Sequence, residues 1–322
     1  MMPFEVKVYD KNYESRWQTL HSRAGNATIF HDLRFLSYHA ADKHRTSHLV
    51  FLEGDSLIAV LPSAIEDTGG VSTLRSPYGG SWGGLLLPAK LGTEQVHNLV
   101  TSMIEFAPEL GVNRIEITLP PLVHLETRDQ IQEYALLANG FRLKKGELSE
   151  VIRLSQFDEA ALPSPYRRGV RKASKEGVTV SRSGDLGLFH EILCKDRATK
   201  NVKPTHSLAD LERVRELCPD AVVLFTAEAD GRVVGGVLLF VTSKKTVLNM
   251  YLCQLPDVKT ARVANLLMYE SVVWARDKGF TYLDLGTSSI GTVPNWGLTR
   301  FKEGFLGRGF IRPTFVFDRD RT

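Results

Sequence analysis

The chain has 322 residues, 43% of them hydrophobic, which is enough to bury two cores of ordinary domain size. Its formal net charge of +3 at pH 7 is too small to indicate nucleic-acid binding by the whole surface, so a basic binding site would have to be local. The three cysteines, Cys194, Cys218 and Cys253, show no CxxC spacing, which argues against a disulfide framework or a zinc site and favours the reducing cytoplasm.

The N-terminal segment 1–17 alternates acidic and basic side chains without an apolar leader. Since no run of about 18 apolar residues follows, we expect neither export nor membrane insertion. A glycine-rich segment, SPYGGSWGGLLLP, occupies residues 76–88. The elements predicted in this half, in order, are helices 14–20 and 31–42, two strands in 48–65 around Gly54, helix 93–110 ending at Gly111, and strand 113–120.

The second half repeats this order of elements. They are helices 185–198 and 207–217, two strands in 221–241 around Gly231, strand 246–253, helix 264–278, strand 282–285 and a glycine-bounded loop, 297–307. Gly54 and Gly231 are 177 residues apart, and Ile115 and Leu283 are 168 apart. Offsets this similar indicate a duplicated α/β unit, so we place one domain at residues 1–155 and the other at 156–322.

A basic segment, residues 163–182, opens the second domain with six cations against the single anion Glu176. On a helix from Ser164 onward, Arg168, Arg171, Lys172 and Lys175 would share one face. One interpretation is a solvated helix. The other is a phosphate-contacting face, because clustered like charges repel unless an anion lies among them, and its candidate contacts are Arg167, Arg168, Arg171 and Lys172.

At this point the residues show a family resemblance. The patterns YRRGVRKASKEGV, DGRVVGG, ANLLMYESVVWARDKGFTYLDLG and GLTRFKEGF resemble the FemABX-like branch of the GNAT acyltransferase superfamily, over roughly residues 163–310. The first half shares only the order of elements. The resemblance implies an α/β fold of two tandem GNAT-like domains, each a twisted mixed sheet flanked by helices, with substrate in an interdomain cleft.

The resemblance also implies a reaction class. An acyl or aminoacyl group would pass from acyl-CoA or charged tRNA to an amine or hydroxyl of a cell-envelope or small-molecule acceptor, as in peptidoglycan or polysaccharide biosynthesis. No cofactor would be tightly bound, and acyl-CoA would act as a co-substrate. Such transfer needs a deprotonated nucleophile, an aligned carbonyl and positive groups near the developing oxyanion.

Three residues of the second domain are candidate catalytic residues. Lys302 matches the lysine of the family's RFK-type motif, which implies that it stabilises the transferred ester or its charge; alternatively, it is a surface cation beside buried Phe301 and Phe305. Asp284 would orient an attacking amine or pair with Lys302, or pair elsewhere inside the fold. Tyr251 lies on the strand that faces the donor in GNAT folds, where it would position a carbonyl or pack with a satisfied hydroxyl.

Further candidates would bind substrate. Tyr78 and Trp82, among glycines, would line the acceptor site or staple a turn, and Arg75 is a candidate clamp for phosphate or carboxylate. The segment 256–265 lacks the [QR]xxG[GA] loop of acetyl-CoA-dependent GNAT enzymes, which leaves ordinary CoA binding in doubt. Lys259 and Arg262 remain candidate phosphate contacts there.

Other classes of function compete with acyl transfer. The chief alternative is a non-catalytic protein that binds anions or nucleic acid on a GNAT scaffold. Hydrolase and oxidoreductase motifs such as GxSxG, HExxH and GxGxxG are absent. Four histidines lie between residues 31 and 48, but their spacings match no known ligand pattern, so we expect no metal site.

Overall fold

A computed structural model of the chain describes residues 4–40, 43–127 and 129–319, with the backbone alone described for residues 259–261. The chain forms two compact units, one within residues 1–147 and 311–322 and the other within residues 148–310. Strand β8 (Arg142–Arg153) leads from the first unit to the second, and β16 (Arg308–Asp318) leads back. The sequence had not predicted this return.

The first unit contains two sheets. One is antiparallel, with β1 (Glu5–Val8), β3 (Leu49–Glu53) and β4 (Ser56–Leu61), and contains the predicted turn at Gly54. The other has the order β2-β5-β6-β7-β16-β8. Its remaining strands are β2 (Arg45–Thr46), β5 (Ala64–Thr68), β6 (Val71–Ser76) and β7 (Arg114–Thr118), and its core packs against helices α3 (Thr93–Phe106) and α4 (Ile131–Ala138).

One helix prediction in this unit is confirmed and another is wrong. Helix α1 (Glu14–Arg23) contains the predicted segment 14–20. In place of a helix over 31–42 there are a 3₁₀ turn and the single-turn α2 (Leu33–Leu36). The Asp32 carboxylate caps the N–H of Arg34, which starts the helix at Leu33, and the backbone leaves the helical conformation at Ser37. Residues 41–42 of the predicted helix lie outside the described residues.

The predicted duplication is confirmed, because both units contain a strand, a helix and a second strand that pairs in parallel with the first. In the first unit α3 connects β6 to β7, which pair in parallel. In the second, α8 (Val263–Asp277) connects β12 (Thr246–Gln254) to its parallel neighbour β13 (Tyr282–Thr287). The repeats differ in the strands before this motif. In the first unit β4 belongs to the smaller sheet and β5 pairs with β6, whereas in the second unit the two preceding strands and β12 pair in one sheet.

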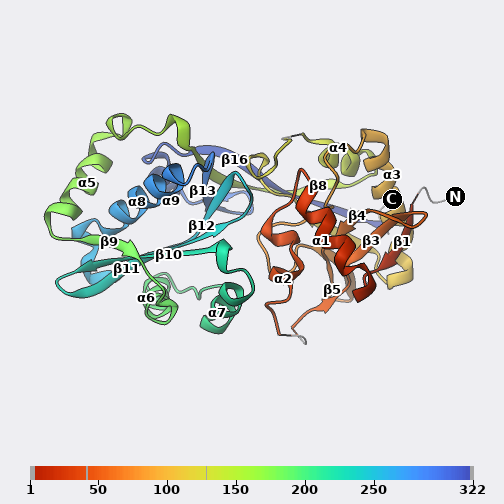
Figure 1. The fold of residues 1–322 in the computed structure, drawn as a ribbon, viewed down its shortest axis with the longest axis horizontal. Helices are drawn as coiled ribbons and strands as arrows, with labels where there is room; N and C mark the ends of the chain where they lie inside the picture. The colour runs from red at the N-terminus through yellow and green to blue at the C-terminus, as the bar shows by residue number, and fades with distance from the viewer. Residues whose placement is uncertain (1–3, 41–42, 128, 320–322) are drawn as a thin grey trace. The chain divides into compact units, whose positions relative to one another are not determined.

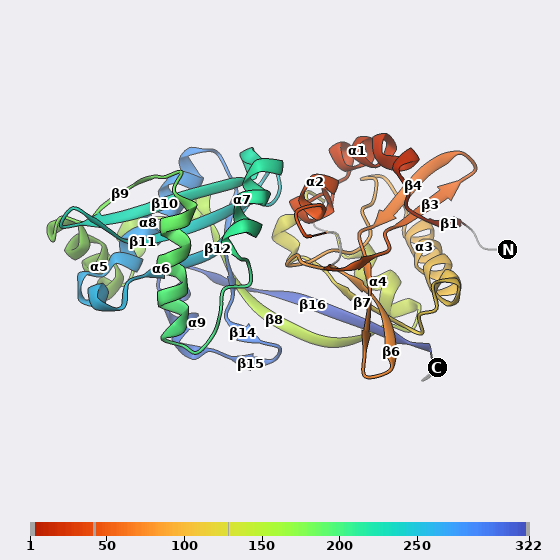
Figure 2. The same ribbon diagram turned by 90° about the horizontal axis from the view of Figure 1, so that it is seen from below.

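The second unit is a single sheet between helices. Its order is β8-β13-β12-β11-β10-β9, with β9 (Thr179–Arg182), β10 (Val222–Ala229) and β11 (Arg232–Val241). Helices α6 (Leu186–Ala198) and α7 (Leu208–Leu217) lie on one side of these strands, and α5 (Ser164–Lys175) and α8 lie on the other (Figures 1 and 2). Val237, Leu239, Leu267 and Phe305 belong to the core between the sheet and α8.

The segment predicted to be a loop at residues 297–307 is instead largely helical, as α9 (Trp296–Glu303). Asn295 caps this helix by accepting a hydrogen bond from the N–H of Leu298. Gly304 ends it against Tyr166, whose ring lies 2.0 Å from where a Cβ would stand. Gly304 therefore serves close packing, although a glycine at this position resembles a loop residue in the sequence.

None of the helices in the described part of the chain has both the length and the apolar character that crossing a membrane requires.

Candidate functional site

A pocket of about 850 Å³ lies in the second unit where β12 and β13 separate. The two strands pair from Thr246 and Tyr282 to Leu248 and Asp284, and beyond that point both line the pocket. β13 turns away because Gly286 has φ +75° and because its register with β8 shifts between Asp284 and Thr287. β12 also has an extra residue, Met250, at its register shift with β11, so irregularities in both strands lie at the opening.

Lys302 closes the base of this opening. Helix α9 buries its side chain, which is 4% exposed, so the alternative that Lys302 is a surface cation is wrong. Its Nζ donates to the carbonyl oxygens of Gly286, at 2.6 Å, and Thr287, at 3.0 Å. The ammonium thus holds the bulge in β13, and the Lys302 residue lines the pocket.

Two buried carboxylates flank the ammonium. Glu150 Oε2 lies 3.5 Å from Lys302 Nζ and also accepts a hydrogen bond from Ser288 Oγ. The other carboxylate oxygen, Oε1, accepts no hydrogen bond from the described residues. Asp284 accepts from Ser149 Oγ at 2.6 Å and from the N–H of Gly286 at 2.7 Å. Burial lowers the pKa of Lys302 to about 8, and the two carboxylates oppose that shift.

Sequence reasoning found Lys302 and Asp284 but missed Glu150. The available signal was an acidic residue inside a strand whose neighbours are apolar, EVIRL at 150–154. That pattern shows only that the carboxylate is buried, because its partners Ser288 and Lys302 lie far along the chain. The catalytic roles of Lys302 and Asp284 stay predictions.

Tyr251 lies on β12, as expected, with a satisfied hydroxyl. The side chain is 5% exposed, and its oxygen contacts the N–H and Nδ1 of His206 at 3.2 and 2.7 Å. Burial raises the pKa of this phenol. These contacts support the packing interpretation of Tyr251. The residues of β12 that line the pocket are Asn249, Met250, Leu252, Cys253 and Gln254.

The start of α8 also borders the pocket, and it is already capped. The N–H of Ala264 donates to Gln254 Oε1 at 2.9 Å, so a side chain occupies the first-turn amide that an anion would otherwise use. Arg262 is exposed and lines the pocket. The side chain of Lys259 lies outside the described residues.

The charges that line the pocket are mainly positive. Arg197 and Lys200 lie within 3.0 Å of Asp196, while Arg262 and Lys302 add two further cations. The described lining thus holds four cations and one anion. An anionic group is the ligand that this balance favours.

Helix α5 confirms that the basic segment is helical, and it presents its cations to solvent. Gly169, Val170 and Ala173 are buried on its inner face. Arg168, Arg171 and Lys172 are exposed, and the last two form long ion pairs with Glu159 at 3.8 Å and Glu176 at 3.4 Å. Arg167 is half-buried and donates to the carbonyl oxygen of Ala160. Exposed pairs of this kind contribute little, so both interpretations of this face remain open.

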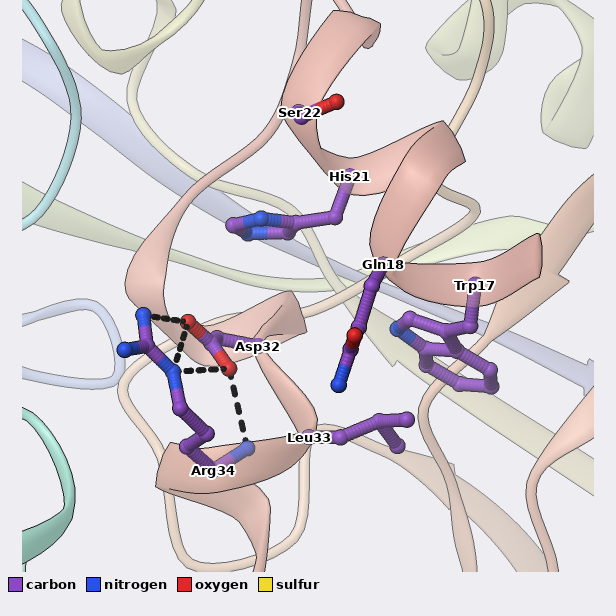
Figure 3. A pocket seen from close by; sticks show the side chains of 7 residues that line it. All are labelled: Trp17, Gln18, His21, Ser22, Asp32, Leu33 and Arg34. Atoms are coloured by element: carbon purple, nitrogen blue, oxygen red, sulfur yellow. Dashed lines mark hydrogen bonds and ion pairs between the residues drawn. The ribbon is translucent and has the colours of Figure 1, made fainter. Parts of the chain in front are cut away.

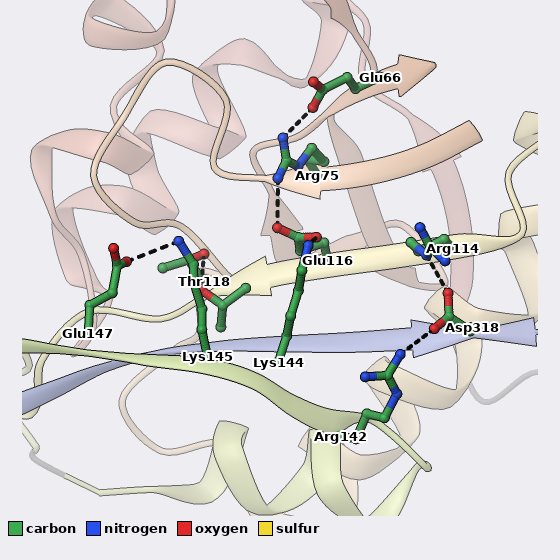
Figure 4. A network of polar contacts seen from close by, with 11 residues as sticks. Glu66, Arg75, Arg114, Glu116, Thr118, Arg142, Lys144, Lys145, Glu147 and Asp318 are labelled. Carbon is green, nitrogen blue, oxygen red and sulfur yellow. Dashed lines mark hydrogen bonds and ion pairs between the residues drawn. The ribbon is translucent and has the colours of Figure 1, made fainter. Parts of the chain in front are cut away.

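In the first unit, the proposed clamp Arg75 is engaged by the protein's own carboxylates. It pairs with Glu66 and with Glu116, the latter at 2.7 Å, and Glu116 also pairs with Lys144 (Figure 4). Neighbouring strands repeat this arrangement, since Asp318 lies between Arg114 and Arg142 (Figure 4). Arg75 therefore stabilises the polar face of this sheet, and its role toward a substrate stays a prediction.

Tyr78 and Trp82 are buried, at 7% and 1% exposed. The Trp82 ring packs against Phe30 and His124, and its Nε1 donates to Thr28 Oγ1 at 3.3 Å. This arrangement supports the interpretation of the glycine-rich segment as an aromatic-stapled turn.

We expect Trp82→Ala to lower the free energy of unfolding of the first unit by about 3–5 kcal/mol, because it leaves a cavity where a buried ring was. Urea denaturation measures this loss. Tyr134→Ala, at a side chain 59% exposed, is the matched control and should change stability by less than about 0.5 kcal/mol. Equal effects of the two substitutions would contradict the packing interpretation.

A second hollow, of about 340 Å³, lies in the first unit beside α1 and α2 (Figure 3). The side chains shown in Figure 3 include Asp32 and Arg34, which pair with each other at 2.7 Å. No group of three or more His, Cys, Asp or Glu is placed to hold a metal ion in the described part of the chain.

Comparison with known proteins identifies the second unit and the fold. Residues 164–303 match the family model described as an acetyltransferase (GNAT) domain. FemX is 14% identical over 98% of both chains, with a TM-score of 0.72. L-PGS from Bacillus licheniformis is 11% identical over 97% of this chain and 92% of its own, with a TM-score of 0.65.

A tandem GNAT protein from the clavulanic acid biosynthesis pathway is 12% identical over 98% of both chains, with a TM-score of 0.59. A search of curated proteins found no match. The predicted fold of two tandem GNAT-like domains is thereby confirmed, and the resemblance to the FemABX-like branch is confirmed as a likeness of fold. The predicted cleft between the domains stays a prediction.

Proposed function

Because the second unit carries a GNAT domain, we propose that this protein is an acyltransferase whose activated donor binds in the pocket between β12 and β13. The observation that carries the proposal is the buried ammonium of Lys302 at the point where two parallel strands separate. An acyl carbonyl inserted there would develop its negative charge beside a fixed cation.

The reaction that we propose joins the donor's carbonyl carbon to an acceptor amine or hydroxyl. The new C–N or C–O bond forms as the C–S bond of a thioester or the C–O bond of an aminoacyl ester breaks. The acceptor's proton passes to the departing sulfur or oxygen. Lys302 stabilises the oxyanion, and Asp284 keeps Lys302 in place by fixing Gly286, whose carbonyl oxygen accepts from Nζ.

The charge of the pocket and the start of α8 bear on which donor binds. Both acyl-CoA and charged tRNA are anionic, which suits a pocket lined by four cations and one anion. The capped N–H of Ala264 weakens the usual pyrophosphate position, and this favours charged tRNA. We place the acceptor among cell-envelope or small-molecule compounds and the reaction in the cytoplasm, which suits the three free cysteines.

The direct test supplies the full-length protein with acetyl-CoA or with a set of charged tRNAs, together with amine-bearing and hydroxyl-bearing acceptors. Release of free CoA or deacylated tRNA, with the acyl group recovered on an acceptor by mass spectrometry, is the expected result. Consumption of neither donor, with no donor protecting pocket residues from hydrogen exchange, would overturn the proposal.

The exposed cations of α5 favour a second role, contact with the phosphates of a nucleic-acid donor. We expect the combined change Arg168→Ala, Arg171→Ala and Lys172→Ala to weaken tRNA binding and to lower the slope of log K against log salt by about 2–3. Neutralising Lys195, Arg213 and Arg276, exposed cations on other helices, is the matched control. An unchanged slope would show that the face of α5 is simply solvated.

A further inference from the structure

A short segment beside the pocket exposes an unusual amount of apolar surface. The ribbon of β14 (Ser289–Ile290) and β15 (Val293–Pro294) leads directly into α9 (Figure 2). Ile290 is 87% exposed, Val293 70%, Trp296 61% and Leu298 37%. Large apolar side chains that cluster in this way mark a binding surface, whereas isolated ones need no explanation. We call these four residues the apolar rim.

The apolar rim adjoins the pocket. Leu298 lines the pocket together with Asn295 and Gly297 of the same segment. Across the opening, Val202 also lines the pocket and is 51% exposed. The rim residues are outside the second unit's apolar core cluster, which includes Phe305 and against which Phe301 packs. Any surface that covers the rim therefore also meets the mouth of the pocket.

The charges around the rim are mainly positive, with Arg262 and Arg300 against the exposed Glu303 that ends α9. Residues 285–302 contain no acidic side chain. Arg300 follows Trp296 by one helical turn, so it shares the exposed face of α9, and its guanidinium makes no ion pair within the described residues. Arg262 adds another exposed cation at the pocket.

The three faces of α9 thus differ in what they contact. Thr299 and Lys302 are buried, and Lys302 lines the pocket together with Leu298 and Phe301. Trp296, Arg300 and Glu303 face solvent. A tryptophan and aliphatic side chains bordered by cations are the composition of protein surfaces that lie in the headgroup layer of an anionic membrane. Burial of the apolar rim would supply attraction to any bilayer, and the cations would add preference for acidic lipids.

We propose that the apolar rim binds the surface of an anionic lipid bilayer and thereby holds the mouth of the pocket at headgroup depth. The contact is peripheral, with Ile290, Val293 and Trp296 entering the interface and Arg300 meeting lipid phosphates. Membrane binding does not depend on the proposed acyl transfer, so each can fail separately. If both hold, an acceptor that is anchored in a membrane could reach the pocket without leaving the lipid.

The test is cosedimentation of the full chain with phosphatidylcholine vesicles that contain or lack phosphatidylglycerol. We expect binding to the acidic vesicles that weakens with salt. Ile290→Ser, Val293→Ser and Trp296→Ser combined should weaken it by about tenfold or more. The control combines Tyr134→Ser, Leu137→Ser and Leu143→Ser, at side chains 59, 52 and 55% exposed in the first unit, and should bind like the wild type.

The wavelength of tryptophan emission gives a second measurement. It would not change if the apolar rim had only a structural role. Trp17 and Trp82 are buried, Trp274 is half-buried, and Trp296 is exposed, so a blue shift on acidic vesicles should come from Trp296. Trp296→Phe should keep most of the vesicle binding and lose the blue shift. Transfer to a small soluble acceptor should be unchanged in the triple serine variant, which separates this proposal from the proposed function.

Several results would overturn the proposal. These are no binding to acidic vesicles, equal binding by the triple serine variant, or a blue shift that persists in Trp296→Phe. A concentration-dependent dimer that disappears in the triple serine variant, without vesicle binding, would assign the rim to contact between two copies of the chain instead.

Discussion

Lys302→Met is expected to lower kcat/KM for acyl transfer by about 10²–10³-fold while the protein stays folded. Methionine keeps most of the buried stem of Lys302 but removes the ammonium that donates to the carbonyl oxygens of Gly286 and Thr287. The charge that we propose stabilises the developing oxyanion is then missing from the pocket. Steady-state kinetics with the donor identified by the direct test measure the loss.

Two controls make this result specific. Lys278→Met changes an exposed lysine at the end of α8, and we expect it to leave kcat/KM unchanged. Circular dichroism and thermal unfolding show whether Lys302→Met retains the fold. A folded Lys302→Met protein with full activity would remove Lys302 from the mechanism.

Glu150→Gln is expected to change both the pH dependence of the reaction and the stability of the second unit. Glu150 and Lys302 form a buried ion pair. Burial lowers the pKa of Lys302 to about 8, and the Glu150 carboxylate opposes this shift. Without the carboxylate the pKa of Lys302 falls further. The alkaline loss of kcat/KM, expected above about pH 8 in the wild type, should therefore begin at a lower pH.

The stability change follows from the same pair. Leaving one member of a buried ion pair uncompensated costs about 3–5 kcal/mol, and the double variant Glu150→Gln with Lys302→Met should recover much of that loss. Urea denaturation of the four proteins closes the cycle. Additive effects in the double variant, with an unchanged pH profile in Glu150→Gln, would show that the two residues are not coupled.

The sign of the pH effect on stability can be worked out for Lys302 itself. Its folded pKa is about 8, below the usual 10.5, so between these values the unfolded chain binds more protons than the folded one. The contribution of this lysine to the free energy of unfolding therefore rises as pH increases from about 8 to 10.5. At neutral pH the buried ammonium costs stability, as expected of a group kept for its chemistry.

The sequence predicted the elements whose pattern is local. Helices α3 and α8 and the turns at Gly54 and Gly231 follow from apolar periodicity and glycine positions. Helix α9 was missed because Gly297 and Gly304 resemble loop residues, although Gly304 is there for Tyr166. The return of β16 to the first unit depends on pairing with β7, whose residues are far away in the sequence.

Some residues of the candidate site could also be predicted from the sequence, and others could not. Lys302 could be found because a family motif marks it, whereas its partner Glu150 belongs to β8 and meets it only in the folded chain. The sequence could not show whether Trp82 and Tyr251 face a ligand or the interior, because an aromatic side chain suits both environments. Contacts with Phe30 and with His206 settle that both side chains pack within the fold.

The return of β16 has a consequence for folding during synthesis. β16 lies between β7 and β8 in the sheet of the first unit, yet among the described strands it is made after all of those that it joins. The second unit, by contrast, lies within the continuous segment 148–310 and is complete before that strand emerges. Since domains fold as units when their chain becomes available, the unit that carries the proposed donor pocket can form first. The first unit would then finish folding after the second, although most of its residues are made earlier.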